Sequence, residues 1–232
     1  MNARDCVVGL VVEGPSDERT VRDLVGRMLD VSPSFQGIAH GELFITWRAA
    51  ATMRVPRRHG DFGKGPAKTE DAPATSNALQ AFVGRETRPV AVVLLRDSDG
   101  KQDERMLAIK GECEARPWPF KILVGVPHTK RECWILAALG VSKMHKAEAD
   151  ALKKQHQALG FDPTKTSEKL TDPKDGNPKN PKTVLNALIG SNNKDREEEL
   201  FHQIDLERLR EHGARNGLAD FMAEIEAKLC QL

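Results

Sequence analysis

The sequence contains no tyrosine, and phenylalanine and tryptophan together make up only 5% of it. Proteins that bind single-stranded nucleic acid without sequence preference stack successive bases on aromatic side chains. The scarcity of aromatic residues therefore argues against a base-stacking platform. The chain has 35 Lys and Arg residues and 34 Asp and Glu residues, and its net charge of +1 does not indicate a nucleic-acid partner. Any electropositive surface has to be local.

The chain also lacks cysteine pairs and long apolar runs. Its four cysteines form no CxxC motif, which argues against a disulfide framework or a zinc site. They are Cys6, Cys113, Cys133 and Cys230. No apolar stretch reaches membrane-spanning length, and no apolar segment follows a basic start as in a signal peptide. We therefore expect a cytoplasmic protein without membrane contact, and leave open whether it forms oligomers.

The chain is organised around the stretch from Val90 to Gly100. Ala91 to Leu95 are five consecutive apolar residues rich in valine, a pattern typical of a strand buried on both faces. Asp97 and Asp99 follow, where open α/β sheets bind ligands. Two carboxylates this close repel each other unless a cation such as Mg²⁺ lies between them. Asp-Ser-Asp-Gly is equally good turn chemistry, so the stretch alone favours neither interpretation.

The first part of the chain alternates between predicted strands and helices. Cys6 to Val12 predicts a central strand, which ends at Glu13. Gly14 permits a sharp turn, and a helix with one apolar face is expected from there to about Leu29. A second strand is expected over Glu42 to Trp47, where apolar and polar residues alternate.

A basic segment without periodicity follows, from Arg48 to Thr75. We expect a long mobile loop, whose charge and glycines suit a phosphate backbone; an ordinary solvated loop is the alternative. Its candidate nucleic-acid-binding residues are Arg54, Arg57, Arg58 and Lys64.

The next segments complete the alternation. Helices are expected over Ser76 to Arg85 and Lys101 to Arg116, and a strand over Phe120 to Val126. A further helix begins near Glu132. This order predicts an α/β fold with a mainly parallel sheet of four or more strands and helices on both faces.

After Gly140 the strand patterns stop, and a helical extension is expected. We therefore divide the chain into an α/β domain, residues 1–140, and a C-terminal extension packed on it, residues 141–232. Asp162 to Lys182 shows no core pattern. The predicted helices are Lys146 to Leu159, Val184 to Ile189, Glu197 to His212 and Leu218 to Leu229.

Acidic residues gather where the predicted strands end. They are Glu13 with Asp17, Asp97 with Asp99, and Glu132. A glutamate after the first strand and Asp-x-Asp after a later one resemble the toprim domain, the catalytic fold of topoisomerases, primases and certain nucleases. The form Glu-Gly-x-Ser-Asp, together with Glu132 beside Trp134, is similar to the nuclease branch of the overcoming-lysogenisation-defect family. It also resembles the stand-alone toprim proteins of bacterial defence loci.

The resemblance covers about the first 140 residues and carries functional expectations. It implies a nuclease that uses one or two Mg²⁺ or Mn²⁺ ions in anti-phage defence, with Glu13 as general acid/base or bridging ligand. The implied metal ligands are Glu13, Asp17, Asp97, Asp99 and Glu132. A topoisomerase is excluded, because without tyrosine this chain forms no phosphotyrosine intermediate.

Two features depart from the family pattern. Arg96 stands where the family mostly has an apolar residue, and could pair with Asp97 or reach a phosphate. Related full-length nucleases carry an ATPase, but this sequence has no G-x-x-x-x-G-K-[ST] motif, so any ATPase is a separate partner. Lys130 is a further phosphate-binding candidate, although a solvated side chain is the simpler interpretation.

The acids also have simpler interpretations. Asp17 can favour the helix dipole, and Glu132 can be an ordinary acid in a first turn. Two other functions stay open: a non-catalytic toprim module that binds an ATPase or nucleic acid, and a primase-like nucleotidyl transferase.

Overall fold

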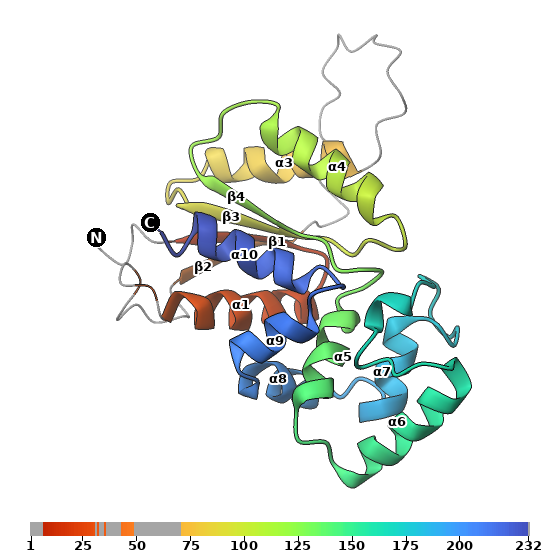
Figure 1. Ribbon diagram of the computed structural model, residues 1–232. Helices are drawn as coiled ribbons and strands as arrows, with labels where there is room; N and C mark the ends of the chain where they lie inside the picture. Colours follow the sequence, from red (N-terminus) through yellow and green to blue (C-terminus); the bar gives the residue numbers. More distant parts are fainter. Residues whose placement is uncertain (1–6, 31, 33–34, 36–42, 49–70, 232) are drawn as a thin grey trace, which may run out of the picture.

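The computed structural model describes residues 7–30, 32, 35, 43–48 and 71–231. Its centre is a four-stranded sheet in the order β2-β1-β3-β4, with every neighbouring pair parallel (Figure 1). This confirms the predicted parallel sheet and the two adjacent central strands. The strands are β1 (Val8–Val12), β2 (Phe44–Arg48), β3 (Ala91–Leu95) and β4 (Lys121–Gly125).

Helices cover both faces of the sheet. Figure 1 shows α3 (Asp71–Val83) and α4 (Gln102–Glu114) on one face, and α1 (Pro15–Asp30) and α10 (Leu218–Lys228) on the other. Alternate residues of β3 enter the two separate cores: Val92 joins the cluster with α3 and α4, whereas Val93 joins the larger cluster with α1 and α10. The apolar run of β3 is uninterrupted because both faces need apolar side chains.

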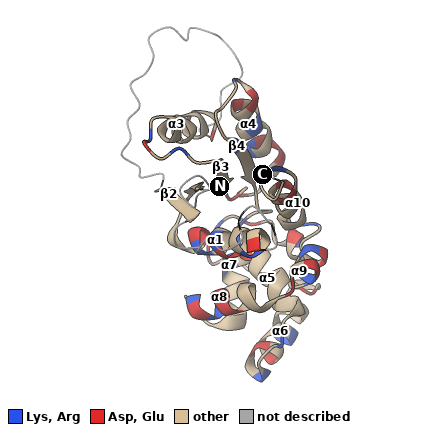
Figure 2. Cartoon of the chain, turned by 90° about the vertical axis from the view of Figure 1, so that its left-hand side faces the viewer, with Lys and Arg blue, Asp and Glu red and all other residues tan. Residues whose placement is uncertain are grey.

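The remaining helices gather beside the C-terminal ends of the strands, around the buried helix α5. Figure 2 shows α5 almost free of charged residues, whereas α6, α8 and α9 contain residues of both charges. The larger core runs from the sheet through α5 into these helices without interruption. They are α5 (Glu132–Val141), α6 (Lys146–Leu159), the 3-10 turn η3 (Ser167–Lys169), α7 (Pro181–Ile189), α8 (Lys194–Gln203) and α9 (Leu206–His212).

Several predicted helices have different bounds in the structure. The helix expected from Val184 begins at Pro181, with Asn180 as its cap. The helix expected from Ser76 begins at Asp71, and Pro73 lies in its first turn, where proline is tolerated. The single helix expected over Glu197 to His212 is divided into α8 and α9. The carboxylate of Asp205 caps α9 by accepting backbone N–H bonds from its first turn, which starts a new helix there.

The segment before α7, expected to lack a core pattern, nevertheless buries Leu170 in the main core and Asn180 as the cap of α7. The candidate phosphate-binding residues Arg54, Arg57, Arg58 and Lys64 lie outside the described residues. Among the helices of the described part, none has the length and apolar character needed to span a membrane.

Candidate acidic site at the strand ends

The parallel sheet brings the predicted acids to one edge. Glu13 follows β1, Asp97 lies two residues after β3, and Glu132 begins α5 after β4. Because β1, β3 and β4 run in the same direction, their carboxyl ends meet at this edge. Asp97 lies close enough to Glu132, Asp17 and Glu13 to feel their charges.

Asp97 is the centre of this group. Burial raises its pKa most, and the charges of Glu132, Asp17 and Glu13 raise it further, to about 8. The Oδ1 atom of Asp97 accepts a 2.8 Å hydrogen bond from the backbone N–H of Arg131, which acts in the opposite direction. An ionised Asp97 therefore lacks sufficient positive charge around it.

Asp99 is oriented differently from Asp97. Its carboxylate lies 3.0 Å from the guanidinium of Arg105, and its charge is felt by Glu13. Arg105 also donates to the backbone carbonyl of Asp97. Arg105 therefore neutralises Asp99 and holds the loop after β3.

The loops after β3 and β4 hold each other through their backbones. Asp99 N–H donates to the carbonyl of Thr129 over 2.9 Å, and Thr129 N–H donates to Ser98 Oγ over 2.6 Å. Thr129 has φ of 61°, a conformation that a β-branched residue rarely adopts. This strained conformation persists because Thr129 is fully buried and bonded on both sides. The hydrogen bonds between these two loops hold the backbone N–H of Arg131 against Asp97.

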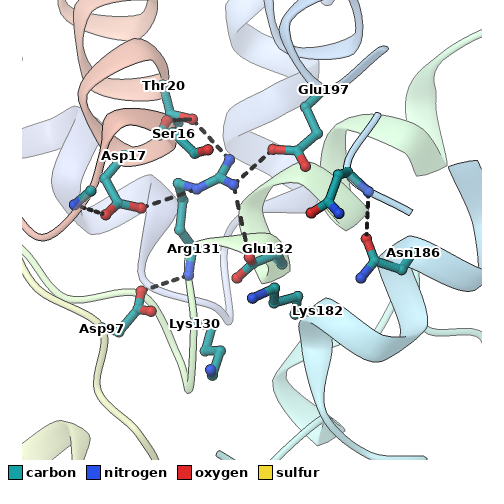
Figure 3. A network of polar contacts seen from close by, with 12 residues as sticks. Ser16, Asp17, Thr20, Asp97, Lys130, Arg131, Glu132, Lys182, Asn186 and Glu197 are labelled. Carbon is teal, nitrogen blue, oxygen red and sulfur yellow. Dashed lines mark hydrogen bonds and ion pairs between the residues drawn. The ribbon is translucent and has the colours of Figure 1, made fainter. Parts of the chain in front are cut away.

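The guanidinium of Arg131 is the main cation of the site, and only 4% of its side chain is exposed. It lies 3.2 Å from Asp17 and donates to Thr20 over 3.0 Å and to Glu197 over 2.7 Å (Figure 3). Glu132 is 3.8 Å away. Burial lowers the pKa of Arg131, but these carboxylates outweigh it and raise the pKa. Arg131 thus ties α1, α5 and α8 together.

Two of the predicted metal ligands have raised pKa values although each has a cation beside it. For Asp17, burial outweighs Arg131 and the 2.8 Å hydrogen bond from Gly14 N–H. For Glu13, burial outweighs Arg96, whose guanidinium lies 2.6 Å away. The arginines therefore compensate these carboxylates only in part.

Arg96 does not pair with Asp97, which was one of its two predicted roles. Its guanidinium bridges Glu13, at 2.6 Å, and Asp71, at 2.9 Å. Arg105 reaches the other oxygen of Asp71 over 3.4 Å. The side chain of Arg96 turns toward β1 and α3 because two carboxylates from those elements face it there.

Sequence reasoning missed four residues of the site: Arg105, Arg131, Asp71 and Glu197. Arg131 precedes Glu132, and its place in that motif was the one available signal. Asp71 comes from α3 and Glu197 from α8, and no local pattern connects either residue to the strand ends. They are brought in only by the packing of these helices.

Lys130 lies at the rim of the same edge. Its ammonium donates to Asp175 over 2.9 Å, and Lys182 donates to the other oxygen of Asp175 over 3.1 Å. A polar cavity of about 250 Å³ opens between these parts, and Asp17, Glu132, Lys182 and Lys194 are among its lining residues. The cavity therefore joins two of the acids to cationic side chains of the C-terminal helices.

Hard oxygen donors such as these carboxylates are the kind that Mg²⁺ and Mn²⁺ prefer. The carboxylates of the site outnumber the three arginines among them, and the raised pKa of Asp97 reflects this excess of negative charge. Within the described residues, however, no three Asp, Glu, His or Cys side chains are arranged to hold one metal ion. The donor chemistry fits a divalent cation, and the side chains would have to turn from their arginine partners to bind it.

Comparison with protein-family models, curated proteins and solved structures found no match.

Proposed function

We propose that this protein is a metal-dependent nuclease of the toprim type, which hydrolyses phosphodiester bonds of DNA or RNA. The observation that carries the proposal is the environment of Asp97. A partly buried carboxylate at the end of a central parallel strand lies beside Glu13, Asp17 and Glu132, and its pKa is raised to about 8. Such an arrangement is typical of sites that bind a cation or perform acid–base chemistry.

Asp97, Glu13 and Asp17 are the proposed inner ligands, with Asp99 and Glu132 beside them. When bound, one or two Mg²⁺ or Mn²⁺ ions supply an activated water and stabilise charge on the phosphodiester. In this proposal Glu13, which lies beside Arg96 and is affected by the charges of Asp17 and Asp99, accepts or returns a proton. Arg96 is about one-third exposed and can turn from Glu13 toward a phosphate oxygen.

The resemblance to defence-associated toprim proteins extends the proposal to a context. The nuclease would act in the cytoplasm against phage or foreign nucleic acid, as the effector of an ATPase encoded beside it. The helices α6, α8 and α9 are rich in charged residues (Figure 2), many of them exposed, and would offer a surface for that partner.

One observation favours a second candidate, a toprim module that binds an ATPase or nucleic acid without cleaving it. Arg96, Arg105 and Arg131 already engage Glu13, Asp99 and Asp17. If these pairs persist in solution, the acids serve the fold and not a metal.

A cleavage assay separates the two candidates. The purified chain, alone and with the neighbouring ATPase, is incubated with DNA and with RNA in Mg²⁺ or Mn²⁺. Wild-type protein should cleave, and Asp97→Asn should lower the cleavage rate by about a hundredfold or more. The control Glu86→Gln changes an exposed acid before β3, at the opposite end of the sheet, and should leave the cleavage rate unchanged. Metal binding measured by calorimetry completes the test. Undiminished cleavage by the Asp97→Asn variant, or a wild-type chain that binds no metal, would contradict the nuclease proposal.

A further inference from the structure

Two lysines beside the acidic site converge on a single carboxylate. Lys130, in the loop before α5, donates to Asp175 Oδ1 over 2.9 Å. Lys182, in the first turn of α7, donates to Asp175 Oδ2 over 3.1 Å. The two ammonium groups are thus held on opposite oxygens of one anion. Figure 3 shows both lysines beside Glu132, at the edge of the acidic site.

Within the described residues, the Asp175 carboxylate accepts no hydrogen bond from the backbone of its own turn. The turn is fixed by other groups: Asp172 accepts from Lys174 N–H over 2.9 Å and from the Asn177 amide over 2.7 Å. Gly176 N–H donates to Thr183 Oγ1 over 2.8 Å. Both hydrogen bonds that the Asp175 carboxylate accepts within the described residues come from lysine ammonium groups. Its contribution is therefore to the lysines and not to the backbone.

The Asp175 carboxylate and Lys182 are exposed enough to exchange partners, whereas the side chain of Lys130 is only 16% exposed. The Asp175 side chain is 55% exposed and that of Lys182 is 45% exposed. Ion pairs at such positions contribute little to stability and are screened by salt. Lys182 also lines both the cavity beside Asp17 and Glu132 and a second cavity on α7, of about 380 Å³. An extended anion leaving the acidic site along α7 would therefore pass the position of Asp175.

We propose that Lys130 and Lys182 bind a phosphodiester group of the nucleic acid, and that Asp175 holds this place until the substrate displaces it. This inference rests on the proposed nuclease function. The tetrahedral oxygens of a phosphate offer each ammonium an acceptor, as the two oxygens of Asp175 do. Asp175 thus acts as an internal competitor that weakens binding and keeps both lysines oriented.

Binding of a fluorescent 20-nucleotide DNA, measured by anisotropy in EDTA, tests the inference without requiring cleavage. Asp175→Asn should bind about two to five times more tightly than the wild type, which is the effect of removing weak exposed ion pairs. The control Asp150→Asn removes the same charge from an exposed position on α6 and should leave affinity unchanged. Circular dichroism melts confirm that each variant is folded.

A second background shows whether Asp175 acts through the lysines. In the Lys130→Met, Lys182→Met double variant, binding should weaken, and adding Asp175→Asn should no longer tighten it. The inference is overturned if Asp175→Asn has no effect, if Asp150→Asn gives the same gain, or if the gain survives without the lysines. Tighter binding with no cleavage in any metal would retain the anion site and reject the nuclease proposal, so the two failures are distinguishable.

Discussion

Replacing Asp97 by asparagine should stabilise the metal-free protein, and should do so increasingly as the pH rises. Asp97 has a pKa of about 8 in the folded protein, against 3.8 for an unperturbed aspartate. Between these values the folded state binds more protons than the unfolded state, so stability falls as the pH rises through the window. Asparagine cannot ionise, and its carbonyl can still accept the N–H of Arg131.

The magnitude follows from the displacement of the pKa. Roughly four pH units at about 1.36 kcal/mol each set a ceiling of about 6 kcal/mol. Neighbouring carboxylates can take up protons and water can enter, so we expect about 2–4 kcal/mol at pH 8 and under about 1 kcal/mol at pH 5. For a chain of this size, that gain corresponds to a rise in Tm of roughly 4–15 °C at pH 8.

Thermal melts in EDTA at pH 5, 6, 7 and 8 measure this effect. Asp99→Asn is the matched control, because Asp99 is more exposed and paired with Arg105. It should cost about 0.2–1 kcal/mol with no gain at high pH. Addition of Mn²⁺ should stabilise the wild type more than Asp97→Asn. An Asp97→Asn protein that is no more stable at pH 8, or equally stabilised at pH 5 and pH 8, would refute the reasoning.

Two further predictions concern cationic residues. Arg131→Met should lower the free energy of unfolding by about 3–5 kcal/mol, because it removes the buried guanidinium that pairs with the partly buried Asp17 and Glu197; a urea-unfolding midpoint close to that of the wild type would contradict the central role of Arg131. Changing Arg57 and Arg58 together to alanine should weaken binding about equally for unrelated nucleic-acid sequences and flatten the log-log salt dependence by roughly one unit for each phosphate that is no longer bound. Anisotropy titrations at several salt concentrations measure this, and an unchanged slope would remove the basic segment from the nucleic-acid interface.

The fold was largely predictable because the apolar composition of its strands indicates that they are buried. Ala91 to Leu95 is uninterruptedly apolar, and the structure assigns β3 to the same five residues. Helix bounds were less predictable, since they depend on single residues such as Pro73 and Asp205. Proline can lie in a first helical turn or outside a helix, and aspartate can cap a helix or lie within one. Neither residue therefore fixes the start of a helix until the backbone conformation is known.

The acidic edge was predictable for the same topological reason, but its cations were not. Parallel strands imply that Glu13 and Asp97 lie together, whatever the rest of the chain does. The partners of these acids depend on packing between distant segments, as Glu197 on α8 and Asp71 on α3 show. Such pairings leave no periodic signal, so the sequence indicated carboxylates without showing that arginines stand between them.

The arginines differ in how readily they can release their carboxylates. Arg131 is buried and contacts partners on three helices, so its departure would leave several charges unpaired. Arg96 is about one-third exposed and lies at the rim with Glu13. A cation approaching the site should therefore enter on the side of Glu13 and Asp97, where the arginine can turn to solvent or phosphate. Asp17, which Arg131 holds, would then bind the cation from the side of α1. It would be the last of the acids to exchange its partner.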